Sequence, residues 1–221
     1  LQSAGGRGVL FGGGSGVRRG RVSVLGGGVA GLCAARVAAG MGADVTVFDV
    51  DVARMRYIDE VWGGRIGTRF SSPLAVREAC GESDVVIGSV LVPGARTPHL
   101  VDHEMVLGMV PGSVLVDVAV DQGGCFEDSH PTTHADPTFV VGGSVFYCVA
   151  NMPGAVPHTS TYALTNATMR YVLLLADEGW RGACGSRDDL RRGLATCGGK
   201  LVSAPVGEAL GIECVPVSEV L

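Results

Sequence analysis

The stretch RVSVLGGGVAGLCAAR, residues 21–36, decides the fold of this chain. Its first five residues, RVSVL, predict a β-strand, and the alanine-rich run from Gly31 to Ala39 predicts a helix. Gly26, Gly28 and Gly31 between them form the pattern G-x-G-x-x-G. In the order strand, glycine turn, helix, this pattern is typical of a loop that holds the diphosphate of a dinucleotide. The free N–H groups at the start of such a helix favour an anionic group.

A carboxylate follows at the end of the next predicted strand, residues 44–49. Asp49 stands 21 residues after Gly28. A carboxylate at this place can accept hydrogen bonds from both ribose hydroxyls of an adenosine, and it would repel a 2′-phosphate. We therefore predict NAD rather than NADP as the cofactor. A strand-end carboxylate that only shapes a turn is the alternative.

The chain as far as residue 157 alternates predicted strands with short predicted helices. Further strands are expected at 65–70, 84–90, 113–120 and 144–150, and helices at 52–61, 73–80 and 103–110. Such alternation predicts parallel β-α-β units, and the near-continuous apolar strands predict a sheet covered on both faces. The expected fold class is α/β, with a Rossmann-type doubly wound parallel sheet over residues 21–157.

The two ends of the chain differ from this pattern. Residues 1–20 contain the run GGGSG and are expected to form a glycine-rich linker. A long helix is predicted from Thr159 to Gly179, followed by a mixed tail with a hairpin turn at residues 198–199 and a short helix at 205–210. Residues 158–221 are too few to form an independent core, so we expect this C-terminal helix and tail to pack on another domain.

Composition excludes several classes of protein. With 47% hydrophobic and 18% charged residues, the chain is not expected to be disordered. A net charge of −5 and 5% aromatic residues argue against nucleic-acid binding, and the one basic cluster, residues 18–21, fits a solvated strand entrance better than a phosphate track. No apolar run is long enough to cross a membrane, and no metal-ligand pattern is present. Seven cysteines without C-x-x-C favour the reducing cytoplasm.

Two further predicted strands end in polar residues. Asp121 follows the strand at 113–120, directly before two more glycines, and is a candidate to orient a cofactor ribose or to assist proton transfer. Asn151 follows the strand at 144–150 and carries an amide suited to a carboxamide or a substrate carbonyl. A loop or helix-cap role for Asp121 and a turn role for Asn151 remain open.

Five longer stretches stand in one order along the chain. They are VLGGGVAG (24–31), VLVPGA (90–95), DVAVDQGGCFE (117–127), YCVANMP (147–153) and TSTYALTNAT (159–168). Together they resemble the bacterial alanine dehydrogenases, essentially from Gly5 to the C-terminus. The stretches DQGGCFE and VANMP are far more specific than the glycine pattern. The proton-translocating transhydrogenases share the wider fold and are the competing family.

The resemblance implies a reversible, NAD-dependent oxidative deamination of L-alanine to pyruvate and ammonium, carried out in the cytoplasm by a homo-oligomer that is a hexamer in the family. It also implies which residues bind the cofactor. Asp49 would hold the adenosine ribose, and Asp121 and Asn151 would be the catalytic candidates at the nicotinamide end. The full set of cofactor-binding candidates is Gly26, Gly28, Val29, Ala30, Gly31, Asp49, Arg54, Ser71, Val90, Leu91, Val118, Ala119, Val120, Asp121, Val149, Ala150, Asn151 and Met152.

The chain departs from the family in one respect. Family members carry a preceding substrate domain that supplies an arginine, a lysine and a histidine, and these 221 residues contain no counterpart of it and begin without methionine. We therefore expect the NAD-binding and C-terminal part of a longer enzyme, without turnover of its own. The alternatives are a short NAD-binding protein without turnover and a transhydrogenase-type nucleotide-binding subunit.

Overall fold

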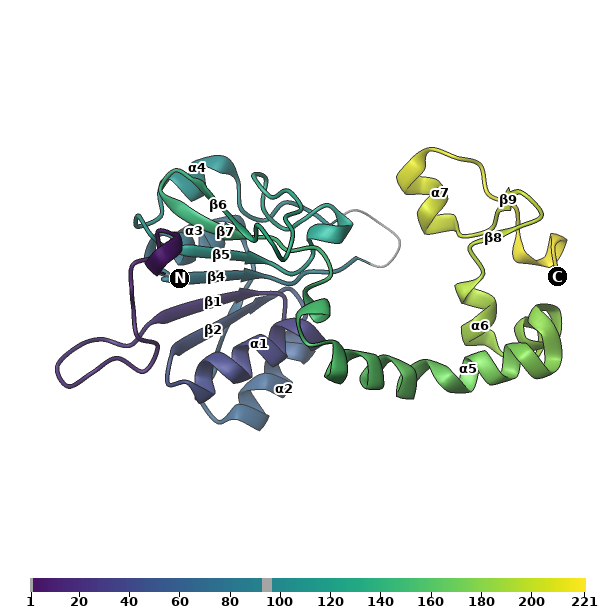
Figure 1. Cartoon of the computed structure of the whole chain (residues 1–221), viewed down its shortest axis with the longest axis horizontal. Helices are drawn as coiled ribbons and strands as arrows, with labels where there is room; N and C mark the ends of the chain where they lie inside the picture. Colours follow the sequence, from purple (N-terminus) through teal and green to yellow (C-terminus); the bar gives the residue numbers. More distant parts are fainter. Residues whose placement is uncertain (1, 93–96) are drawn as a thin grey trace. The chain divides into compact units, whose positions relative to one another are not determined.

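The computed structural model describes residues 2–92 and 97–221, which divide into two compact units (Figure 1). Of the described residues, unit 1 contains 2–91 and 97–152, and unit 2 contains 92 and 153–221. Positions 93–95 of the quoted stretch VLVPGA lie outside the described residues.

A seven-stranded sheet is the centre of unit 1. Its strands are β1 (Arg21–Leu25), β2 (Asp44–Asp49), β3 (Gly67–Phe70), β4 (Val85–Gly88), β5 (Val114–Asp117), β6 (Thr138–Val141) and β7 (Ser144–Tyr147). The order across the sheet is β3-β2-β1-β4-β5-β7-β6, and each neighbouring pair is parallel except β6 with β7. The predicted α/β fold with a doubly wound, mostly parallel sheet is confirmed.

Helices cover both faces of this sheet (Figure 1). Helices α1 (Val29–Gly40) and α2 (Val52–Trp62) pack on one face, and α3 (Pro73–Glu82) and α4 (His103–Leu107) pack on the other. Alternate residues of each strand therefore enter different cores: Val24 belongs to the core beneath α1, whereas Leu25 belongs to the core beneath α3. This burial on both faces explains the continuous apolar strands of the sequence.

Side chains cap three of these four helices. Asp51 accepts hydrogen bonds from the first N–H groups of α2, Ser72 caps α3, and Asp102 caps α4. Helix α1 differs, because its N-cap residue is Gly28 and no side chain caps it. The first turn of α1 is thus left without a side-chain partner.

The strand boundaries differ from those expected. Strands β5 and β7 end at Asp117 and Tyr147, because the chain then turns into the short 3-10 helix η2 (Val120–Gln122) and into an irregular segment. The sequence also gave no sign of β6, a four-residue antiparallel edge strand. Phe139 of this strand stacks between His130 and Phe146, with ring centroids 3.7 Å and 5.0 Å away, and these contacts fix the strand to the sheet.

The N-terminal segment is fixed to the sheet at the amino ends of the parallel strands. The segment opens with the 3-10 helix η1 (Gln2–Ala4). Asp84, which is 3% exposed, accepts hydrogen bonds from the guanidinium groups of Arg7 (2.8 Å) and Arg18 (2.6 and 3.0 Å) and from the backbone N–H of Arg21 (2.9 Å). Burial works to raise the pKa of the Asp84 carboxyl, but the hydrogen bonds and charges of these arginines outweigh it and hold that pKa below its usual value.

Unit 2 consists of helices and one small hairpin. After η3 (Met152–Ala155) it contains α5 (Pro157–Ser186), α6 (Asp188–Gly193), β8 (Thr196–Cys197), β9 (Lys200–Leu201), α7 (Ala204–Leu210) and η4 (Val217–Glu219). The hairpin turn and the short helix are as predicted. The predicted break at Gly179 is present (φ 67°, ψ 167°), but helical structure resumes beyond it.

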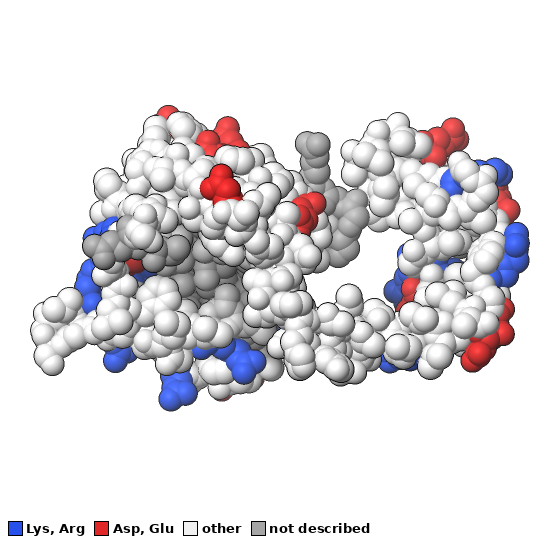
Figure 2. All heavy atoms as spheres, viewed as in Figure 1, with Lys and Arg blue, Asp and Glu red and all other residues white. Residues whose placement is uncertain are grey.

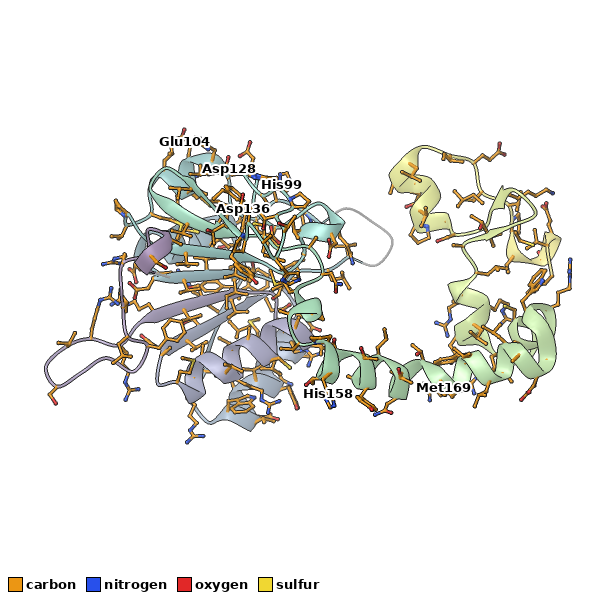
Figure 3. All side chains as sticks on the ribbon, viewed as in Figure 1. His99, Glu104, Asp128, Asp136, His158 and Met169 are labelled. Atoms are coloured by element: carbon orange, nitrogen blue, oxygen red, sulfur yellow. The ribbon has the colours of Figure 1, made fainter. Side chains whose placement is uncertain are left out.

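Few side chains of unit 2 are buried. Among its described residues only Ala183, Cys184 and Gly207 are buried. Large apolar side chains are exposed along α5, namely Tyr162, Leu164, Met169, Val172 and Leu173. Met169 and His158 both project outward from this helix (Figure 3).

Charged side chains on the face drawn in Figure 2 lie in separate small groups rather than in one continuous basic stripe. No helix in the described ranges is both long and apolar enough to cross a membrane.

Candidate cofactor site at the carboxyl ends of the strands

The glycine loop lies where the strand order reverses, between β1 and β4. In open α/β sheets this reversal opens a crevice at the carboxyl ends of the strands. Gly26 has φ 99°, and a Cβ on it would lie 3.0 Å from the carbonyl oxygen of Ser89. A Cβ on Gly31 would lie 1.9 Å from the Gly26 oxygen. Gly26 thus forms a tight turn, and Gly31 allows the start of α1 to pack closely on that turn.

The N-terminus of α1 borders open space at this crevice. A Cβ built on Gly28 would meet no atom within 4 Å, and Val29 is 83% exposed. Because no side chain caps α1, its first N–H groups remain able to donate hydrogen bonds to an anionic group. This arrangement fits the diphosphate of a dinucleotide.

Asp49 lies beside the glycine loop. Its Oδ2 accepts a hydrogen bond from the Gly27 N–H (2.6 Å), and its Oδ1 accepts one from the Asp51 N–H (2.9 Å). The Ser71 N–H donates to the Asp49 carbonyl (2.9 Å). The Arg54 side chain lies against Gly27, since a Cβ on Gly27 would lie 3.2 Å from the Arg54 Cγ. The structure therefore brings these predicted adenosine-side residues together.

The end of β4 supports the loop from the other side. The Ser89 hydroxyl lies 2.9 Å from the carbonyl oxygens of both Leu25 and Gly26. Val90 is half-buried and contacts the loop, since a Cβ on Gly26 would lie 3.0 Å from its Cγ2, whereas Leu91 is 56% exposed.

Asp121 and Asn151 meet at the ends of β5 and β7. The Asn151 N–H donates to Asp121 Oδ2 at 3.3 Å, and His134 Nε2 donates to the Asn151 carbonyl at 3.2 Å. Both residues are exposed. Among the described residues Asn151 is the one non-glycine with positive φ (53°), a conformation that asparagine tolerates better than most residues.

The other candidates beside these two residues differ in exposure. Val118 is exposed, and Ala150 and Met152 are half-buried. Ala119, Val120 and Val149 are buried, so their side chains belong to the apolar core and only their backbone groups can serve a ligand.

Sequence reasoning did not single out three polar residues at this edge. Ser89 and Asp117 are polar residues at the ends of apolar strands, and that placement was the available signal. His134 gave no local signal, because its contact with Asn151 joins residues 17 apart in the chain. Within the described ranges no three His, Cys, Asp or Glu side chains are grouped as a metal would require.

Comparison with known proteins bears on this site. Residues 1–204 match the family model described as alanine dehydrogenase/PNT, C-terminal domain. The chain belongs to this family. The match confirms the resemblance to the alanine dehydrogenases that the sequence indicated. The domain of this family is of the NAD(P)-binding type.

Individual relatives agree with the family match. The alanine dehydrogenase of Mycolicibacterium smegmatis is 58% identical over all 221 residues, which correspond to 60% of that protein. A solved L-alanine dehydrogenase superposes on 95% of this chain with a TM-score of 0.85 and 48% identity, using 58% of its own length. A transhydrogenase from Sinorhizobium meliloti matches 63% of this chain and 40% of its own, with a TM-score of 0.56 and 34% identity. The chain thus spans about 60% of the length of the curated relatives it matches.

Proposed function

We propose that this chain is the NAD-binding portion of an alanine dehydrogenase, which interconverts L-alanine with pyruvate and ammonium. One observation carries the proposal: the uncapped N-terminus of α1 stands next to the Asp49 carboxylate, and Gly27 joins the two. Family resemblance further implies a cytoplasmic homo-oligomer, a hexamer. A transhydrogenase-type role has less support, because that relative matches a smaller part of the chain at lower identity.

At the adenosine half, each residue would have a distinct task. The first N–H groups of α1 would bind the diphosphate, and Gly28 would allow its close approach. Asp49 already accepts two backbone N–H groups, and the remaining lone pairs of its oxygens would accept the ribose hydroxyls. A 2′-phosphate would meet this carboxylate at close range, which favours NAD over NADP.

At the other half, Asp121 and Asn151 would act on the nicotinamide side. When bound, NAD would supply the hydride acceptor for C2 of alanine. Asp121 has one oxygen turned to the Asn151 N–H, and the other oxygen would orient a ribose hydroxyl or hold a proton. The Asn151 amide would hydrogen-bond a carboxamide or a substrate carbonyl. We expect binding without alanine turnover from these 221 residues alone, because in this family a separate domain supplies the substrate-gripping arginine, lysine and histidine.

The test is to measure NADH and NADPH binding by calorimetry on the chain and on Asp49→Ala. We expect the parent chain to bind NADH more tightly than NADPH. Asp49→Ala should weaken NADH binding about tenfold, or about 1.4 kcal/mol, and should reduce the difference in affinity between NADH and NADPH. Asp44→Ala is the matched control, because Asp44 is an exposed aspartate at the opposite end of the same strand, and it should change the affinity less than about twofold.

Two results would contradict the proposal. A folded parent chain that binds no NADH would exclude the site altogether. An unchanged affinity in Asp49→Ala would show that the ribose is held elsewhere.

A further inference from the structure

Asp117, the last residue of β5, carries a buried carboxylate that the proposed function does not use. Its exposed fraction is 0%. A carboxylate this deep in a protein is costly unless hydrogen bonds compensate the lost water. Three donors do so: the Ala119 N–H at Oδ1 (3.0 Å), and the Cys125 N–H (2.8 Å) and the Ser129 hydroxyl (2.5 Å) at Oδ2.

These donors bracket the loop that carries Asp121. Ala119 stands before Asp121, Cys125 closes the loop after it, and Ser129 follows a few residues later. The loop passes directly against the carboxylate, because a Cβ on Gly124, which has φ 81°, would lie 2.8 Å from Asp117 Oδ2. One side chain thus ties both ends of the loop.

The same carboxylate is linked to the segment that carries Asn151. Ser129 Oγ accepts a weak hydrogen bond from the Cys148 thiol (3.8 Å). The Thr132 N–H donates to the Cys148 carbonyl (2.9 Å), and the Ala150 N–H donates to the Thr132 carbonyl (3.1 Å). Residues 129–132 therefore run beside residues 148–150. A buried link through Asp117 and Ser129 lies beneath the exposed link between Asp121 and Asn151.

Both thiols next to this carboxylate remain protonated. Burial, and secondly the charge of Asp117, raise the pKa of Cys125 to about 12. Burial is also the main cause that raises the pKa of Cys148 to about 11. The Cys148 thiol can therefore donate to Ser129 over the whole physiological pH range.

We propose that Asp117 is a positioning residue, whose carboxylate holds the 118–124 loop in the one arrangement in which Asp121 meets Asn151. It thereby sets the affinity for the nicotinamide half of the cofactor and not for the adenosine half. This inference rests on the proposed function of the site, and it adds a residue to which that function gives no task.

The experiment compares two ligands by calorimetry on the 221-residue chain. NADH occupies both halves of the site, whereas ADP-ribose lacks the nicotinamide. Asp117→Asn keeps the shape of the side chain but turns one acceptor oxygen into a donor that faces other donors. We expect the Kd of NADH to rise at least about fivefold, a change of about 1 kcal/mol, and the Kd of ADP-ribose to stay within about twofold. The fluorescence change of NADH on binding should shrink in the same variant.

Two further variants sharpen the comparison. Ser129→Ala removes the hydroxyl that contacts Asp117 and Cys148, and it keeps the backbone hydrogen bonds of Thr132 and both ties of the loop. It should therefore raise the Kd of NADH by a smaller factor, again without an effect on ADP-ribose. Asp84→Asn makes the same chemical change at a buried carboxylate directly before β4, at the amino ends of the strands and away from the cofactor site. It should leave both affinities within about twofold.

Each possible result decides the inference. Equal weakening of both ligands by Asp117→Asn, or no effect on either, would overturn it. If Asp117→Asn does not fold, Ser129→Ala is judged by the same two criteria. If the parent binds ADP-ribose as tightly as NADH, the nicotinamide half contributes nothing, and this inference fails while the adenosine site stands. If the parent binds neither ligand, the proposed function itself fails.

Discussion

The three glycines of the motif are required for different reasons. Gly26 needs its positive φ, and Gly31 needs the absence of a Cβ, which would lie 1.9 Å from the Gly26 oxygen. Gly28 has an ordinary φ of −65° and borders open space. The folded chain therefore has no need of glycine at position 28, and only a ligand that approaches the backbone there would need it.

Alanine substitutions should separate these roles. Gly28→Ala should fold, with a loss of about 1 kcal/mol or less, the usual cost of alanine at an N-cap, and should weaken NADH binding about tenfold. Gly31→Ala should lose about 1–3 kcal/mol of stability by overpacking, together with binding. Urea denaturation and calorimetry on both variants measure these effects. Undiminished NADH affinity in Gly28→Ala would show that no ligand backbone contact exists there.

A single residue could be singled out from the sequence as a site candidate where its position at the end of a predicted strand was itself the signal. Asp49 was singled out from its position at a strand end, but its hydrogen bond to Gly27 depends on the pairing of β1 with β2. Asp117 was not singled out because its partners are backbone and hydroxyl groups of a loop whose path the sequence does not reveal. Contacts between segments are what local sequence patterns cannot show.

At the scale of elements, the N-terminal segment depends on Asp84. Residues 1–20 have the composition of a linker, yet two of their arginines, Arg7 and Arg18, bind the buried Asp84 carboxylate. The pKa of Asp84 is lower in the folded chain than its ordinary value, so its contribution to stability is present above the pKa of the unfolded chain, about 3.9, and is lost as the pH falls through the folded pKa.

Asp84→Asn should therefore lower the free energy of unfolding by about 1–3 kcal/mol at pH 7, because Arg7, Arg18 and the Arg21 N–H lose an ionised acceptor. The difference from the parent should shrink below about pH 4, where the Asp84 carboxyl of the unfolded chain begins to protonate while that of the folded chain is still ionised. Urea denaturation at several pH values measures it. Glu82→Gln, at an exposed neighbour that is 69% accessible and pairs with Arg21, is the control and should cost less than about 0.5 kcal/mol. A difference that stays constant with pH would contradict this account.

Strand ends were less predictable than strands. Ala119, Val120 and Val149 are apolar and buried, so the sequence extends the strand pattern past the last paired residues of β5 and β7. Burial and pairing are separate requirements, and hydrophobicity reports only burial. The edge strand β6 is the converse case, since it is paired along its length but its residues are mostly half-buried.

At the scale of the whole molecule, the two units differ in how much they bury. Unit 1 has an apolar core on each face of its sheet, whereas α5 of unit 2 leaves most of its large apolar side chains exposed. Helices gain most of their stability in proteins from packing of an apolar face. The packing of residues 158–221 on a further domain stays a prediction.

Hydrogen exchange on the 221-residue chain should reveal this difference. We expect amides of β1, β4 and β5 to exchange at least about a hundredfold more slowly than amides of α5 between Tyr162 and Leu175, because local opening of a poorly packed helix costs little free energy. Exchange followed by mass spectrometry or NMR measures both groups. Equal protection of α5 and the central strands would show that the helix is stabilised within this chain.

The left-handed backbone at Asn151 narrows the choice of amino acids that mutation can place there. Glycine would keep the turn but bring no carboxamide, and aspartate would keep the turn but set a second negative charge beside Asp121. Glutamine would keep the carboxamide but would resist the turn. A saturation library at this codon, selected for NADH binding, should therefore yield asparagine almost alone. The other residues that tolerate the turn lack the carboxamide, and glutamine, which has the carboxamide, does not tolerate the turn.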